Sequence, residues 1–141
     1  MSHVEPDPQR LRQFLEEGDP QAPIVMINLL RYRERAAYPE GSDAAPASGR
    51  EAYQRYGAEA AKHIAAVGGR MLWMGEAHAT VIGPTDERWD DAILVEYPSK
   101  KAFVDMVSNA DYQACAVHRT AALADSRLIC TQTRAGLLDP E

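Results

Sequence analysis

The chain has 141 residues, a length typical of one domain that can bury a hydrophobic core without disulfides or metals. Its 45% hydrophobic and 26% charged residues argue against wholesale disorder, and its formal charge of −6 argues against a nucleic-acid-binding protein. The two cysteines lack CxxC spacing, and we find neither a secretory signal nor an apolar run of about 18 residues, so we expect a cytoplasmic protein with no membrane partner.

The first 48 residues are predicted to contain a helix, a strand and a long loop. The helix covers 7–18, with Asp7 as its N-cap and Pro8 at its first position. A largely apolar strand follows at 22–32. Residues 32–48 are rich in proline, alanine, glycine and charge and show no periodicity, so we expect a loop insert there.

A longer helix is predicted over 48–69. Ser48 and Glu51 have the spacing of a capping box, and Gly68–Gly69 provides a C-terminal stop. Its apolar residues lie on one stripe, which gives the helix a face to bury: Tyr53, Tyr56, Ala60, Ile64 and Val67.

Two strands are predicted next, at 70–82 and 92–98, joined by a turn over 83–91. Such a spacing is typical of an antiparallel hairpin.

The C-terminal part is predicted to contain a helix from Ser99, a second helical segment over 109–123, a last strand at 126–133 and a loose end at 134–141. After the first helix, the order is therefore β-α-β-β-α-β, the pattern of the ferredoxin-like fold. We expect one α+β domain over 1–141, with a four-stranded antiparallel sheet and both main helices on one face.

Alternation along the strands divides their residues between two faces. We assign a nearly apolar set to the face under the helices: Val25, Ile27, Leu29, Met71, Trp73, Ala77, Ala79, Ile93, Val95, Tyr97 and Ile129. The other face mixes apolar and polar residues: Met26, Asn28, Leu30, Leu72, Met74, Glu76, His78, Leu94, Glu96, Leu128, Cys130 and Gln132. No element is left to cover this second face, so we expect a second copy to bury it in a two-fold dimer.

Three segments, EAYQRYGAEAAKHIAAVGGRML, ILVEYPSKKAF and ADYQACAVHRTAAL, together resemble domain-of-unknown-function family 1330 of the dimeric α/β-barrel superfamily. The resemblance covers roughly residues 50–133 and the first strand, and its motifs include Tyr53, Tyr56, Tyr112–Gln113 and Arg119. It implies a ferredoxin-like protomer that pairs into a barrel. Relatives by fold imply cofactor-independent oxygenation or isomerisation of a small, aromatic or carbonyl compound, whereas the family itself has no established common activity.

Glu76 and His78 are spaced two apart on a predicted strand, so their side chains share a face. They are candidate catalytic residues, or half of a metal site beside Glu96, but the sequence has no HxH or HExxH motif and we predict no metal. The plainer interpretation, which we favour, is the polar lining of a dimer face.

Arg119 lies on the same stripe as Tyr112 and Cys115, which should face inward. Its guanidinium is a candidate anion hook for a substrate carboxylate, because its planar fork matches a carboxylate. The alternative, an internal salt bridge, would use one of the nearby acidic residues: Asp111, Glu96 or Asp105.

Aromatic residues are candidates for the walls of a pocket for a flat organic ligand, although helical spacing also suits an ordinary core: Tyr53, Tyr56, Trp73, Tyr97 and Tyr112. His63 and His118 are candidate general bases. A nucleophile elbow, a P-loop and a GxGxxG motif are all absent, so we predict no cofactor.

Two functions follow from these observations. The first is a small-molecule-binding protein or enzyme of the dimeric barrel type, with Tyr53, Tyr56, Trp73, Tyr112 and Arg119 shaping the site and His63 or His78 moving protons. The second is a non-catalytic homodimer that binds a metabolite or a partner through the 32–48 loop.

Overall fold

The structure is a computed structural model and describes residues 2–136. Its elements follow the predicted order: α1 (Pro8–Glu16), β1 (Ile24–Tyr32), α2 (Gly49–Ala66), β2 (Arg70–Glu76), β3 (Asp91–Tyr97), α3 (Lys100–Val107), α4 (Ala110–Ala122) and β4 (Leu123–Thr131). The predicted loose end lies partly outside the described residues, since 137–141 are not among them.

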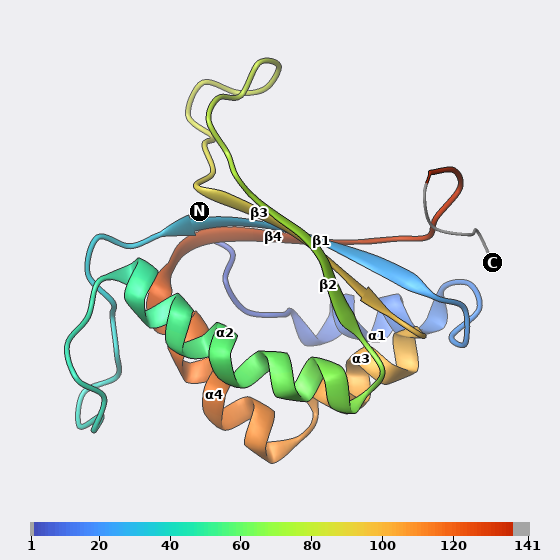
Figure 1. The fold of residues 1–141 in the computed structure, drawn as a ribbon, viewed down its shortest axis with the longest axis horizontal. Coiled ribbons are helices and arrows are strands. Elements are labelled where there is room, and N and C mark those ends of the chain that lie inside the picture. The colour runs from blue at the N-terminus through green and yellow to red at the C-terminus, as the bar shows by residue number, and fades with distance from the viewer. Residues whose placement is uncertain (1, 137–141) are drawn as a thin grey trace.

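The four strands form one antiparallel sheet in the order β2-β3-β1-β4, which is the ferredoxin-like arrangement. The helices lie together on one side of this sheet (Figure 1). We call that side the helix side and the opposite side the open face. The predicted α+β fold is therefore confirmed. Within the described residues, no helix combines the length and the apolar character that crossing a membrane would need.

Local capping explains where the helices begin. The Asp7 side chain accepts a hydrogen bond from the Gln9 amide (2.8 Å) at the start of α1. Ser48 and Glu51 form the predicted capping box at the start of α2, with hydrogen bonds of 3.0 and 2.8 Å. Because each cap satisfies amides that the helix leaves unpaired, it contributes about 1 kcal/mol of stability.

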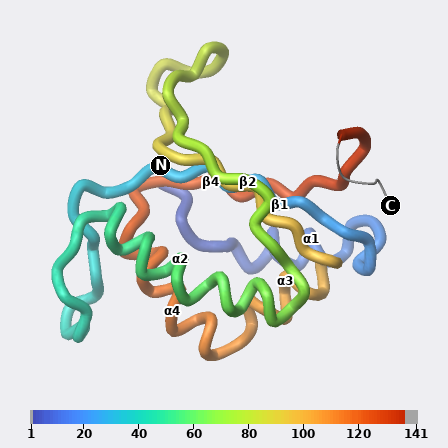
Figure 2. The backbone as a smooth tube through the Cα atoms, viewed as in Figure 1, coloured from blue at the N-terminus to red at the C-terminus, as the bar shows by residue number. Residues whose placement is uncertain are grey.

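The segment between β1 and α2 is a loop, as predicted, and Figure 2 shows it beside the start of α2. It is held at several points. The Ala37 amide donates to the Ala121 carbonyl (2.8 Å), and Tyr38 Oη and His118 Nδ1 form a hydrogen bond of 2.7 Å. Arg55 donates to the Ala45 carbonyl (2.8 Å). These bonds fasten the loop to α4 and α2.

The predicted strand over 70–82 ends earlier, at Glu76. Its neighbour β3 begins only at Asp91, so the residues beyond Glu76 have no strand to pair with. Residues 77–90 instead form a projection, which we call the arm. Figure 1 shows the arm rising on the side of the sheet away from the helices.

The predicted faces of β1 and β4 are wrong by one residue. Met26 and Leu30 are buried on the helix side, because they pair with Val95 and Asp91 of β3. Their neighbours on β1 and β4 therefore point to the open face: Val25, Ile27, Leu29 and Ile129. Leu128 and Cys130 correspondingly lie on the helix side.

The prediction for β2 is wrong for a different reason. A register shift between Met71 and Trp73 inserts one extra residue, so Trp73 pairs with Leu94 and faces the open side. Its indole lies over Gly75, where the Cβ atom of any other residue would come within 2.3 Å of the ring. Met74 moves to the helix side opposite Ile93.

Candidate functional site

Four tyrosines form a continuous row of aromatic contacts on the helix side, which we call the tyrosine cluster: Tyr32, Tyr53, Tyr56 and Tyr112. Successive ring centroids lie 5.5, 5.3 and 6.1 Å apart. Tyr53 and Tyr56 come from one face of α2, and a hydrogen bond of 2.7 Å joins the hydroxyls of Tyr56 and Tyr112 across to α4. The inward stripes of two helices thus place several phenols together.

Burial shifts the ionisation of these phenols further above neutral pH. It raises the pKa of Tyr53 to about 12, although the nearby Arg119 guanidinium acts in the opposite direction. Burial also raises the pKa of Tyr56 and of Tyr112. These phenols are therefore neutral near pH 7 and can donate hydrogen bonds to a ligand oxygen, whereas they are unsuited to remove a proton.

Arg119 is half-buried at the cluster, on the α4 face that also carries Tyr112. Its Nη1 donates to the backbone carbonyl of Val4 (2.7 Å), a neutral acceptor. Among residues 2–136, no carboxylate lies within 4.0 Å of its guanidinium. None of the three acids considered for an internal salt bridge reaches Arg119. Glu96 pairs with Arg70 (2.9 Å), Asp105 pairs with Lys101 (2.9 Å), and Asp111 forms no ion pair among the described residues.

Asp91 at the start of β3 closes the other end of the cluster. This carboxylate is only 4% exposed and accepts a hydrogen bond from Tyr32 Oη (2.6 Å), while Arg50 Nη1 lies 3.4 Å away. The guanidinium carbon of Arg50 also lies 4.7 Å from the centroid of the Tyr32 ring. Burial, and then the bond to Asp91, raises the pKa of Tyr32. The result is a polar group in which a buried carboxylate is satisfied by the partly buried Tyr32 hydroxyl and the more exposed Arg50 guanidinium.

The other candidate residues lie in different settings. His63 approaches the cluster, with its ring perpendicular to Tyr112 at 5.9 Å. His118 instead bonds Tyr38 of the loop, and Tyr97 packs its ring against Phe103 (5.2 Å) in the core near α3.

Glu76 Oε1 and His78 Nε2 lie 3.2 Å apart at the foot of the arm, where the two side chains are 71% and 80% exposed. Trp73 lies on the open face, so the sheet separates it from the tyrosine cluster. Across residues 2–136 we find no group of three or more His, Cys, Asp and Glu side chains arranged to hold a metal ion.

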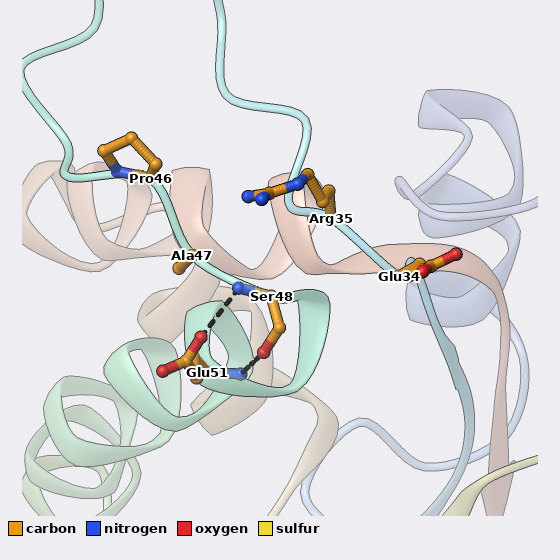
Figure 3. A pocket seen from close by; sticks show the side chains of 6 residues that line it. All are labelled: Glu34, Arg35, Pro46, Ala47, Ser48 and Glu51. Atoms are coloured by element: carbon orange, nitrogen blue, oxygen red, sulfur yellow. Dashed lines mark hydrogen bonds between the residues drawn. The ribbon is translucent and has the colours of Figure 1, made fainter.

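Two hollows mark the surface elsewhere. One has a volume of about 340 Å³ and lies at the root of the loop. Figure 3 shows the residues that line it: Glu34, Arg35, Pro46, Ala47, Ser48 and Glu51. The polar groups of Ser48 and Glu51 already bond each other there. The second, of about 310 Å³, lies between the arm and β4 and includes Glu87 and Arg127. Neither hollow contains a residue of the tyrosine cluster.

Comparison with known proteins identifies the family. The family model of a domain of unknown function, DUF1330, matches residues 47–132. The chain belongs to this family. A crystal structure of a protein of unknown function from Rhodopseudomonas palustris shares 38% identity and a TM-score of 0.87, with 96% of this chain and 100% of that chain covered. A dabb-family protein with a ferredoxin-like fold from Mesorhizobium loti shares 11% identity and a TM-score of 0.48, with 82% and 100% covered. No curated protein matches this chain.

The DUF1330 region contains most of the site. Tyr53, Tyr56, Tyr112, Asp91 and Arg119 all fall within 47–132. Tyr32, the fourth member of the cluster, and Val4, whose carbonyl accepts from Arg119, fall outside that range.

Sequence reasoning missed Asp91 and Arg50. A sequence pattern could have indicated that Asp91 is buried. It lies two residues before Ile93, so alternation along the strand places it on the same inward face as Ile93, Val95 and Tyr97. No sequence pattern indicates the role of Arg50, because its side chain approaches Asp91 only when α2 and β3 come together in the fold.

Proposed function

We propose that this DUF1330 protein is a homodimer that binds a small aromatic carboxylate or carbonyl compound at the tyrosine cluster. The observation that carries the proposal is Arg119, a half-buried cation beside phenols that bonds a neutral carbonyl rather than a carboxylate among the described residues. Buried arginine is normally paired with an acid, so a ligand carboxylate would supply the missing charge.

The chemistry of the cluster fits such a ligand. The guanidinium fork of Arg119 would bind a carboxylate through two parallel hydrogen bonds, which are stronger than its bond to the Val4 carbonyl because both partners are charged. The rings of Tyr53 and Tyr56 offer aromatic contacts to a flat ligand, and their neutral hydroxyls offer donors.

Of the two activities implied by the resemblance, we propose isomerisation over oxygenation. Isomerisation needs a base to move a proton and neutral donors to stabilise an enolate oxygen. The phenols would supply the donors, and His63, packed against Tyr112, is the candidate base. The proton removed from one carbon would return to another, so the reaction needs no further reactant. Glu76 and His78 remain candidates of lower rank, because they lie exposed at the foot of the arm.

The proposed dimer forms through the open face. Trp73 and Ile129 are 52% and 48% exposed there, beside the half-buried apolar residues Ile27 and Leu94. Soluble monomers rarely leave such a contiguous surface bare. The unbridged thiols of Cys115 and Cys130 are consistent with the reducing cytoplasmic location that we include in the proposal.

Thermal unfolding with a matched ligand panel tests the binding site. Benzoate and salicylate should raise the melting temperature of the wild type, whereas the uncharged benzamide should raise it less. Arg119→Gln should abolish the difference between benzoate and benzamide. Arg10→Gln, which removes an exposed arginine of α1, is the matched control and should respond as the wild type does. An equal benzoate shift in Arg119→Gln, or no shift from any probe, would contradict the proposed role of Arg119.

A further inference from the structure

The arm is firmly rooted at its base. The Ala77 amide donates to the Asp90 carbonyl (2.9 Å), and the Asp90 amide donates to the Leu30 carbonyl of β1 (2.7 Å). Arg127 of β4 lies 3.6 Å from the Glu87 carboxylate and 5.0 Å from the centroid of the Trp89 ring. These contacts tie the returning half of the arm to the sheet.

The tip of the arm is apolar and unburied. Val81 and Ile82 are 92% and 94% exposed, the highest values among the large hydrophobic residues of the described chain. Loop tips are usually built from small and polar residues, because an exposed aliphatic side chain gains nothing from water. A rooted projection that ends in two adjacent β-branched aliphatic residues is typical of a surface that contacts another molecule.

The arm and the uncovered part of the sheet lie on the same side of the molecule (Figure 1). Trp73 and Ile129 are exposed on that side, which carries no helix. A two-fold interface must be self-complementary, and this side offers both a projecting apolar element and an apolar surface to receive one. In a dimer that buries the open faces, each arm would extend toward the partner.

We propose that the Val81–Ile82 tip docks on a second copy of this chain, so that two arms clasp the dimer from opposite ends. The inference rests on the proposed homodimer and goes beyond it by assigning the segment that holds the two copies. A lipid surface is disfavoured as the partner, because Asp86 and Glu87 lie close to the tip along the chain and the protein carries a formal charge of −6. A second copy of this chain, which presents the apolar open face to the tip, fits better than a lipid surface.

Sedimentation velocity over a concentration series tests the clasp. The wild type should sediment as twice the 15.6 kDa chain at micromolar concentration. The double substitution Val81→Ser, Ile82→Ser should raise the dissociation constant at least ~10-fold, because it removes the favourable free energy of burying two aliphatic side chains per arm in the interface. Val117→Ser is the matched control, since Val117 is 42% exposed on α4, and it should leave the dissociation constant unchanged.

A photo-crosslinking residue at position 82 gives a second measurement that does not depend on the effect of serine. We expect a covalent product of two chains, joined between the tip of one copy and a peptide of the other. A wild type that sediments as a monomer at all concentrations would overturn both the homodimer and the clasp. A dimer that the double substitution does not weaken, with crosslinks only inside one chain, would overturn the clasp alone.

Discussion

The two sides of the sheet differ in what covers them. Helices of the same chain pack on one side, and no helix of the described chain lies on the other (Figure 1). On the helix side, polar groups meet partners: Tyr56 bonds Tyr112, Tyr32 bonds Asp91 and Arg119 bonds the Val4 carbonyl. Within residues 2–136, no fully buried side-chain nitrogen or oxygen lacks a hydrogen bond. The open face instead leaves Trp73 and Ile129 half exposed, and the arm above it ends in Val81 and Ile82.

The comparison separates two physical tasks. A buried polar group loses its water and must find hydrogen bonds inside the fold, so the buried polar groups of the helix side bond partners within one protomer. Removing an apolar surface from water is favourable, and on the open face only another molecule can cover it. Substitutions on the helix side should therefore change the free energy of unfolding or ligand binding, whereas substitutions on the open face should change association.

The largest expected effect is on the helix side, at Asp91. Asp91→Ala leaves the Tyr32 hydroxyl without its acceptor and removes the carboxylate beside Arg50. Because Arg50 is 53% exposed and can be resolvated, we expect a loss of about 2–4 kcal/mol, below the full cost of breaking a buried ion pair. Urea unfolding measures it, with the exposed Asp86→Ala as the control. Equal midpoints for the two variants would show that Asp91 does not stabilise the fold.

The second prediction concerns alkaline pH. Burial raises the pKa of folded Tyr53 to about 12, whereas an unfolded tyrosine ionises near pH 10. The neutral Tyr53 phenol therefore contributes to the free energy of unfolding in full below about pH 10. This contribution, about 2–3 kcal/mol, is lost as the pH rises from about 10 to 12. Tyr56 and Tyr112 act in the same direction.

Urea midpoints between pH 8 and pH 11.5, together with tyrosinate absorbance, would measure this loss. Tyr53→Phe should show a shallower decline than the wild type, because it removes one of the groups that ionise on unfolding. A wild-type midpoint that stays constant across the range, with tyrosinate formed in the folded protein, would contradict the assignment of buried neutral phenols.

The third prediction moves to the open face. Trp73→Ser removes an exposed indole that rests on Gly75 and pairs across to Leu94. If a second copy covers this face, the dissociation constant should rise ~10-fold, the equivalent of about 1.4 kcal/mol, since a central aromatic residue commonly dominates an interface. Sedimentation against Val117→Ser as the control measures it. An unchanged dissociation constant would place the interface elsewhere.

The same comparison explains what sequence alone could predict. Helix positions followed from caps such as Ser48–Glu51 and Asp7, because capping is local. The faces of β1 could not be assigned, since both alternating sets of residues 24–32 are largely apolar and only pairing with β3 decides between them. The extra residue that turns Trp73 outward, and the early end of β2, also depend on the partner strand.

The candidate site was predictable to the extent that helix periodicity determines it. Tyr53, Tyr56 and Tyr112 come together because each lies on an inward helical stripe, whereas Trp73 and the pair Glu76–His78 depend on strand register and lie elsewhere. The contacts that complete the cluster join distant segments, as when Arg119 reaches Val4. No local pattern encodes such a contact.

The smallest effect that we predict isolates one hydrogen bond. Tyr56→Phe removes the hydroxyl that bonds Tyr112 at 2.7 Å and keeps the ring that contacts Tyr53. The Tyr112 hydroxyl then loses a partner in a buried site, so we expect a loss of about 1 kcal/mol in urea unfolding and no change in the dissociation constant of the dimer. The double variant Tyr56→Phe, Tyr112→Phe should lose less than the sum of the two single variants, because the second substitution removes a hydroxyl that is already unpaired. Strict additivity would mean that the two hydroxyls do not interact, and a changed dissociation constant would mean that the two sides of the sheet are coupled.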